Sequence, residues 1–177
     1  MTDQTPAALE TSRPVLLAVD DEPSVARAVE RDLRRRYGRD YRVLRAGSGE
    51  EALTTLREAK LRGTPIALLL VDQRMPGMSG VELLEAALEI APDAKRALLT
   101  AYADTQAAID AINRVSLDHY LLKPWDPPEE QLYPVVDDLL DAWRAEAPPA
   151  ADRIQLASRS SSTGYSRSSG GFHGFIK

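Results

Sequence analysis

The chain has 177 residues and a hydrophobic content of 44%, which is enough for one domain of ordinary size with an extension. It has no cysteine, so disulfides, thiolate metal sites and thiol nucleophiles are excluded. The net charge is -5 and every acidic residue precedes Arg153, so the acidic body of the chain is a poor general binder of nucleic acid.

Residues 1–12 are polar and rich in Thr, Ala and Pro, and we expect them to form a disordered leader. They lack the apolar stretch of a signal peptide, and no apolar run of the chain approaches the length of a membrane span. We therefore expect a soluble, cytoplasmic protein without a membrane partner.

Five short runs along the chain predict β-strands. The continuous apolar character of the first and third runs is typical of strands that are buried on both faces of a parallel sheet. The predicted strands are Val15–Val19, Tyr41–Leu44, Ile66–Val71, Ala97–Leu99 and Asp118–Leu122.

A helix is predicted after each strand, because a start signal follows each run. Ser48 and Glu51 form a capping-box pattern, and the Pro-Pro-Glu-Glu stretch from Pro127 suits a helix N-terminus. The predicted helices begin at Ser24, Ser48, Ser79, Asp104 and Pro127 and end near Tyr37, Leu61, Pro92, Val115 and Trp143. Strands that alternate with helices predict an α/β fold with a doubly wound parallel sheet, for which several strand orders remain open.

Polar groups follow four of the predicted strands. They are Asp20-Asp21, Asp72, Thr100 and Lys123-Pro124. Because ligands bind where the carboxyl ends of parallel strands meet, we expect three carboxylates, one hydroxyl and one ammonium to converge. Such a set suits a divalent metal, Mg²⁺ or Mn²⁺, beside a carboxylate that accepts a phosphoryl group. Each residue alone has an ordinary explanation, such as a helix cap or a loop charge, but their joint occurrence favours a site.

Four segments, Val19–Pro23, Val71–Gly80, Leu99–Tyr102 and Leu122–Pro124, together resemble the receiver domain of bacterial two-component response regulators. The resemblance covers roughly Arg13 to Trp143. It implies a flavodoxin-like (βα)5 sheet with strand order 2-1-3-4-5. It also implies a receiver domain at residues 13–144, followed by a tail at 145–177.

The resemblance implies a role for each matching residue. Asp72 would be the phosphoacceptor, and the donor would be a phosphohistidine on a sensor histidine kinase or a phosphotransfer protein. Thr100 and Lys123 would bind phosphoryl oxygens, and a cis peptide before Pro124 would aim the lysine. The metal ligands would be Asp20, Asp21, Asp72 and the backbone carbonyl of Arg74.

The same resemblance implies how the signal is read. Thr100 and Tyr120 would be the switch pair, and phosphorylation would shift the face made of the fourth helix, fifth strand and fifth helix. On this face we place Ala107, Asp110, Asn113, Arg114 and His119, the last as a surface histidine.

Two positions depart from family members that lose the phosphoryl group quickly. Arg74 lies two residues after Asp72, and Tyr102 lies two residues after Thr100. These positions flank the path of an attacking water, so bulky side chains there predict slow self-dephosphorylation.

The tail changes in composition from Ala/Pro-rich to Ser/Gly-rich and ends in an aromatic segment, Phe172–Ile176. It is interpreted as a linker or disordered tail, or else as a short docking segment.

Three alternatives to a phosphoaccepting switch remain open. The chain would be a phosphorylation-independent pseudo-receiver, the N-terminal receiver of a longer fused regulator, or an aspartyl-phosphate phosphohydrolase. The last is disfavoured, because such enzymes usually present Asp-x-Asp after the first strand. We expect a signalling domain that catalyses only its own phosphoryl transfer and slow dephosphorylation. Its output partner stays unnamed, a homodimer is possible, and direct nucleic-acid binding is not expected.

Overall fold

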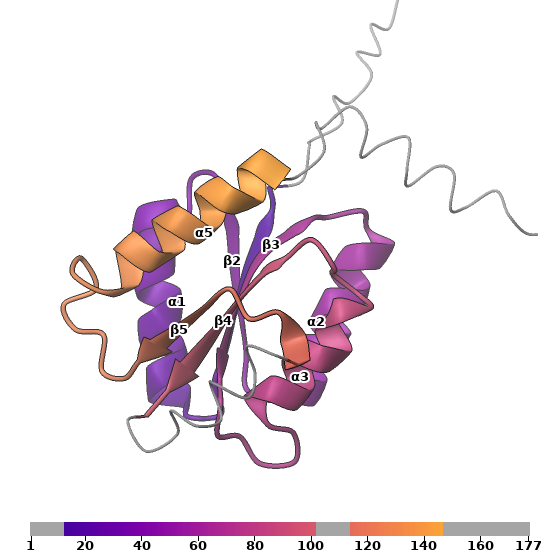
Figure 1. Ribbon diagram of the computed structural model, residues 1–177, viewed down its shortest axis with the longest axis horizontal. Coiled ribbons are helices and arrows are strands. Elements are labelled where there is room, and N and C mark those ends of the chain that lie inside the picture. The colour runs from indigo at the N-terminus through magenta and orange to yellow at the C-terminus, as the bar shows by residue number, and fades with distance from the viewer. Residues whose placement is uncertain (1–12, 102–113, 147–177) are drawn as a thin grey trace, which may run out of the picture. The chain divides into compact units, whose positions relative to one another are not determined.

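The computed structural model describes residues 13–101 and 114–146 (Figure 1). The strands are β1 (Val15–Val19), β2 (Arg42–Ala46), β3 (Ile66–Asp72), β4 (Lys95–Thr100) and β5 (His119–Leu122). The helices are α1 (Pro23–Tyr37), α2 (Gly49–Leu61), α3 (Gly80–Leu88) and α5 (Leu132–Glu146). The helix predicted from Asp104 to Val115 falls almost wholly outside the described residues.

The five strands form one parallel sheet in the order β2-β1-β3-β4-β5. α1 and α5 cover one face of the sheet, and α2 and α3 cover the other (Figure 1). The structure therefore confirms the predicted flavodoxin-like α/β fold and its strand order. Within the described residues, no helix is both long and apolar enough to span a membrane.

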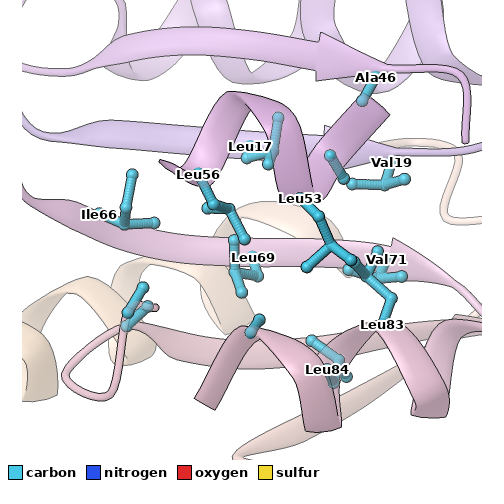
Figure 2. Packing of buried hydrophobic residues seen from close by; sticks show 14 of the residues in the cluster. Leu17, Val19, Ala46, Leu53, Leu56, Ile66, Leu69, Val71, Leu83 and Leu84 are labelled. Atoms are coloured by element: carbon cyan, nitrogen blue, oxygen red, sulfur yellow. The ribbon is translucent and has the colours of Figure 1, made fainter. Parts of the chain in front are cut away.

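Two hydrophobic cores pack on the two faces of the sheet, because successive side chains of a strand point to opposite sides. On one face Leu17, Leu69 and Val71 contact Leu53 and Leu84 from α2 and α3 (Figure 2). On the other face β-strand leucines pack against the aromatic and aliphatic residues of α1 and α5. β1, β3 and β4 are buried along their whole length, which explains the apolar runs in the sequence.

Two predicted helix starts are confirmed by their caps. The Ser48 hydroxyl accepts a hydrogen bond from the Glu51 amide at the start of α2. Ser79 and Glu82 form a complete capping box at the start of α3. These caps need only residues close in sequence, so they can be recognised without tertiary information.

The prediction that Ser24 caps α1 is wrong, because the N-cap is Glu22 and the helix begins at Pro23. Proline is favoured at the first helical position, where its missing N–H costs nothing. The last helix also starts later than predicted, at Leu132. Pro128 disfavours helical backbone at the residue before it, and residues 128–131 form a turn closed by the Tyr133 amide and the Pro128 carbonyl at 2.9 Å.

Several other bounds differ by a few residues. β4 extends from Lys95 rather than Ala97, because the backbone of Lys95 pairs with Leu68 of β3. The Lys95 Nζ is 2.7 Å from Glu146 at the end of α5 and 3.7 Å from Asp118. The first contact connects the start of β4 to the end of α5, and the second connects it to the residue before β5.

Candidate functional site

Asp20 directly follows β1 and is only 2% exposed. One of its carboxylate oxygens accepts the Glu22 amide at 2.9 Å, at the entry to α1. Asp21 follows it and is exposed. The turn from β1 into α1 therefore holds one acid inside the molecule and leaves the next at the surface.

Asp72 is the last residue of β3 and is 7% exposed. Burial raises the pKa of its carboxyl group, and the charges of Asp20 and Asp21 act in the same direction. Lys123 opposes this shift through a hydrogen bond and its charge, but the pKa stays above its ordinary value. The ionised form of Asp72 is therefore disfavoured by its surroundings, and a nearby cation would stabilise it.

Lys123 follows β5, and its Nζ lies 2.7 Å from Asp20 Oδ2 and 2.7 Å from Asp72 Oδ1. Burial lowers the pKa of this ammonium, but the two carboxylates outweigh burial, so the net shift is upward. The peptide bond between Lys123 and Pro124 is cis, as the family resemblance implies. The Lys123 amide donates to the Thr100 carbonyl at 2.8 Å, which ties the end of β5 to the end of β4.

Thr100 ends β4 and is fully buried, and its hydroxyl has no hydrogen-bond partner among the described residues. A buried hydroxyl without a partner costs free energy, so such groups are uncommon and often belong to binding sites. The strand order places Thr100 beside Asp72, since Asp72 pairs with Leu99.

The carboxylates of Asp20, Asp21 and Asp72 offer oxygens that lie within 4.8 Å of one another. Three carboxylates this close repel, and one lysine ammonium compensates only part of that charge. Oxygen donors in such a cluster fit a hard divalent cation such as Mg²⁺ or Mn²⁺. The residues present therefore fit the metal that the sequence predicts.

The connection after Asp72 is held close to the site. The Gln73 amide donates to the Leu99 carbonyl and the Gly80 amide to the Gln73 carbonyl, each at 3.0 Å. A Cβ at Gly80 would contact the Asp72 carbonyl oxygen and would lie 2.9 Å from Leu98 Cδ1. Glycine is needed here because α3 begins against the backbone of β3.

The structure brings together Asp20, Asp21, Asp72 and Lys123, with Thr100 at the next strand end. Arg74 lies exposed in the connection after Asp72, and Tyr102 falls outside the described residues. Their assigned roles, and that of the Arg74 carbonyl, stay predictions.

On the predicted output face, Tyr120 is 40% exposed, and its ring stacks on the exposed His119 with centroids 6.2 Å apart. Arg114 pairs with Glu85 of α3 at 2.9 Å. Ala107, Asp110 and Asn113 lie outside the described residues.

The sequence analysis missed two buried residues that connect the segment after Lys123 to α1, Asp32 and Trp125. Asp32 is buried on α1 although it is charged, and Trp125 is buried two residues after Lys123. A signal was present, because Asp32 directly precedes Leu33 and lies three residues after Val29 on the apolar side of the helix.

A family model described as the response regulator receiver domain matches residues 16–133. The chain belongs to the response regulator receiver domain family. Receiver domains are signalling domains of two-component systems, which agrees with the acidic site at the carboxyl edge of this sheet.

Two of the named proteins that this chain resembles are transcriptional or DNA-binding regulators by their names. The hydrogenase transcriptional regulatory protein HoxA of Cupriavidus necator is 38% identical over 112 residues, which are 63% of this chain and 21% of HoxA. The DNA-binding response regulator MtrA of Mycolicibacterium smegmatis is 31% identical over 68% of this chain and 49% of MtrA. The chain thus spans about a fifth of HoxA and about half of MtrA.

A solved structure supports the same assignment. It is a CheY-like response regulator receiver domain protein from Methanospirillum hungatei JF-1, which matches with a TM-score of 0.64 and 27% sequence identity. The match covers 77% of this chain and 100% of that chain.

Proposed function

We propose that this receiver domain accepts a phosphoryl group on Asp72 from a phosphohistidine of a sensor histidine kinase or a phosphotransfer protein. The observation that carries the proposal is the position of Lys123, whose Nζ contacts both Asp20 and Asp72 at 2.7 Å. A lysine held by two buried acids at the carboxyl edge of the sheet suits the neutralisation of a transferring phosphoryl group.

In this reaction a carboxylate oxygen of Asp72 attacks phosphorus, and the bond from phosphorus to the imidazole nitrogen of the donor breaks. The electron pair of the broken bond goes to the imidazole, which takes up a proton, and an aspartyl phosphate forms. Lys123 then pairs with a phosphoryl oxygen, and the Thr100 hydroxyl, which has no partner among the described residues, donates a hydrogen bond to another.

Asp20, Asp21, Asp72 and the backbone carbonyl of Arg74 would hold Mg²⁺ or Mn²⁺. When bound, the ion supplies positive charge against the transferring oxygens. The donor set supports this assignment, because three carboxylates lie within 4.8 Å of one another.

The same proposal includes a switch. The Thr100 hydroxyl moves to the phosphoryl group, and the half-exposed Tyr120 turns inward beside it. The face around β5 and α5, with the helix predicted before β5, then changes its population of conformations and binds an output partner differently.

We further propose that the receiver occupies residues 13–144, between a leader at 1–12 and a tail at 145–177, and that it works in the cytoplasm. HoxA and MtrA carry the words transcriptional regulatory and DNA-binding in their names, and both are much longer. This supports the interpretation of the chain as the receiver of a longer regulator, in which partners or a second copy act through the switch face.

The test is covalent labelling with acetyl phosphate or phosphoramidate, followed by intact-mass spectrometry. The protein is expected to gain one phosphoryl group only when Mg²⁺ is present, and Asp72→Asn is expected to gain none. Asp40→Asn, at an exposed acid between α1 and β2, is the matched control and should label like the parent. Labelling of Asp72→Asn would overturn Asp72 as the acceptor, and no labelling of the parent with Mg²⁺ or Mn²⁺ would support a phosphorylation-independent module.

Slow loss of the phosphoryl group is a second expectation, because Arg74 and Tyr102 flank the path of the attacking water. Arg74→Asn and Tyr102→Glu are expected to shorten the half-life of the phosphorylated protein by about tenfold, which equals about 1.4 kcal/mol in activation free energy. The half-life is measured by intact mass after the donor is removed. An unchanged half-life in both variants would contradict this role.

A further inference from the structure

The segment between β5 and α5 has one buried side chain to hold it. From Lys123 to Gln131, all of which the structure describes, only Trp125 is buried, while its neighbours Pro124 and Asp126 are exposed. β5 itself is a short edge strand of four residues that pairs on one side with β4. The chain that follows Lys123 is therefore anchored inside the molecule at Trp125.

Trp125 contacts α1. Its indole Nε1 donates to Asp32 Oδ2 at 3.5 Å, and the Asp32 carboxylate is also 3.0 Å from Arg31. Asp32 is 7% exposed and Trp125 is 8% exposed, so this contact lies inside the molecule. Indole N–H groups usually find a partner when they are buried, and a buried carboxylate needs donors.

The far end of the segment closes on the same residue. The Tyr133 hydroxyl, in the first turn of α5, donates to the Asp32 backbone carbonyl at 3.1 Å. One residue of α1 thus holds both ends of the segment that follows Lys123, by its side chain at Trp125 and by its backbone at Tyr133.

We propose that Trp125 is a positioning residue for Lys123 and acts through its indole N–H on Asp32. The contact fixes the chain two residues after the lysine, so that the ammonium lies between Asp20 and Asp72. The kinetic part of the test rests on the proposed function, whereas the chemical part does not.

The kinetic test compares Trp125→Phe with Trp143→Phe. Both substitutions keep an aromatic ring and remove an indole N–H, and both residues belong to the same hydrophobic cluster. At saturating Mg²⁺ and phosphoramidate, Trp125→Phe is expected to slow labelling about fivefold, the usual effect of losing one ordinary hydrogen bond, with unchanged Mg²⁺ affinity. Trp143→Phe should change the rate less than twofold. Equal effects of the two would overturn the proposal.

A double-variant cycle separates positioning from a general structural effect. If Trp125 acts through Lys123, Trp125→Phe is expected to cause no further loss in a Lys123→Ala background. A further fivefold loss in that background would show that the tryptophan acts on the fold and not on the lysine.

A chemical test does not depend on phosphorylation. Acetic anhydride is reacted with each variant, and acetylation of Lys123 is measured by peptide mass spectrometry relative to the exposed Lys60. Trp125→Phe should raise the relative rate at Lys123 about fivefold, because the ammonium leaves its carboxylates more often. If the parent takes no phosphoryl group, the proposed function fails, and this measurement alone decides the positioning role. An unchanged acetylation rate would overturn it.

Discussion

At the scale of single residues, the site concentrates negative charge that its own lysine does not neutralise. Lys123 lies between two carboxylates, Asp20 and Asp72, and the exposed Asp21 adds a third. Burial remains the largest influence on Asp72 and raises its pKa. The Asp72 carboxylate therefore carries a cost in the folded state before any ligand arrives.

This cost predicts a pH-dependent stability difference between Asp72→Asn and the parent in EDTA. Because the folded-state pKa of Asp72 is raised, the parent loses stability as pH rises from the ordinary aspartate pKa through the raised value. Asp72→Asn does not ionise, so it should be more stable than the parent near pH 7, and the difference should shrink toward pH 4. Urea unfolding at several pH values measures it. A difference that grows as the pH falls would contradict the argument.

At the scale of elements, the bounds that local capping decides were predicted correctly, whereas those that backbone pairing or a turn decides were not. The caps at Ser48 and Ser79 were predictable because both partners lie within three residues. The start of α5 was not, because Pro128 and the acids after it read as a helix N-terminus while the backbone forms a turn there. Lys95 was not predicted as part of β4, because the start of this strand is set by backbone pairing with β3 and not by apolar side chains.

The packing of α3 against β3 gives a prediction for Gly80→Ala. Its new Cβ would meet the Asp72 carbonyl oxygen and Leu98, so the start of α3 must move away from β3. We expect a loss of about 1–3 kcal/mol in unfolding free energy together with slower labelling of Asp72. Gly47→Ala is the control, because the nearest atom to its Cβ would be Glu51 Oε2, at the ordinary contact distance of 3.4 Å. Equal stability of the two variants in urea unfolding would show that the close approach is not limiting.

At the scale of the whole molecule, the strand order turns residues that are distant in sequence into one site. Asp20 and Lys123 are 103 residues apart, yet they form a hydrogen bond. The four motifs made this site predictable, since each polar group follows a strand. The Asp32–Trp125 contact was not predictable, because neither residue matches a motif and their meeting depends on how α1 packs beside the segment after β5.

A metal that binds only the folded molecule must stabilise it. Mg²⁺ at a hundred times its dissociation constant is expected to raise the unfolding free energy of the parent by about 2.7 kcal/mol. Asp20→Asn should lose most of this gain, because Asp20 belongs to the carboxylate cluster. Asp40→Asn should keep the gain, because Asp40 lies outside that cluster. Thermal unfolding with Mg²⁺ and with EDTA measures the effect. Full stabilisation of Asp20→Asn would exclude Asp20 as a ligand.

The ion pair between Lys95 and Glu146 has a mechanical consequence. α5 begins after the segment that carries Lys123 and ends where Glu146 pairs with the start of β4, at the opposite edge of the sheet. A helix of 15 residues is about 22 Å long. Charges are screened over about 8 Å at physiological salt, so a phosphoryl charge on Asp72 exerts little force that far away. Under the proposed switch, a partner bound near Glu146 would therefore sense a movement of α5 rather than the phosphoryl charge itself.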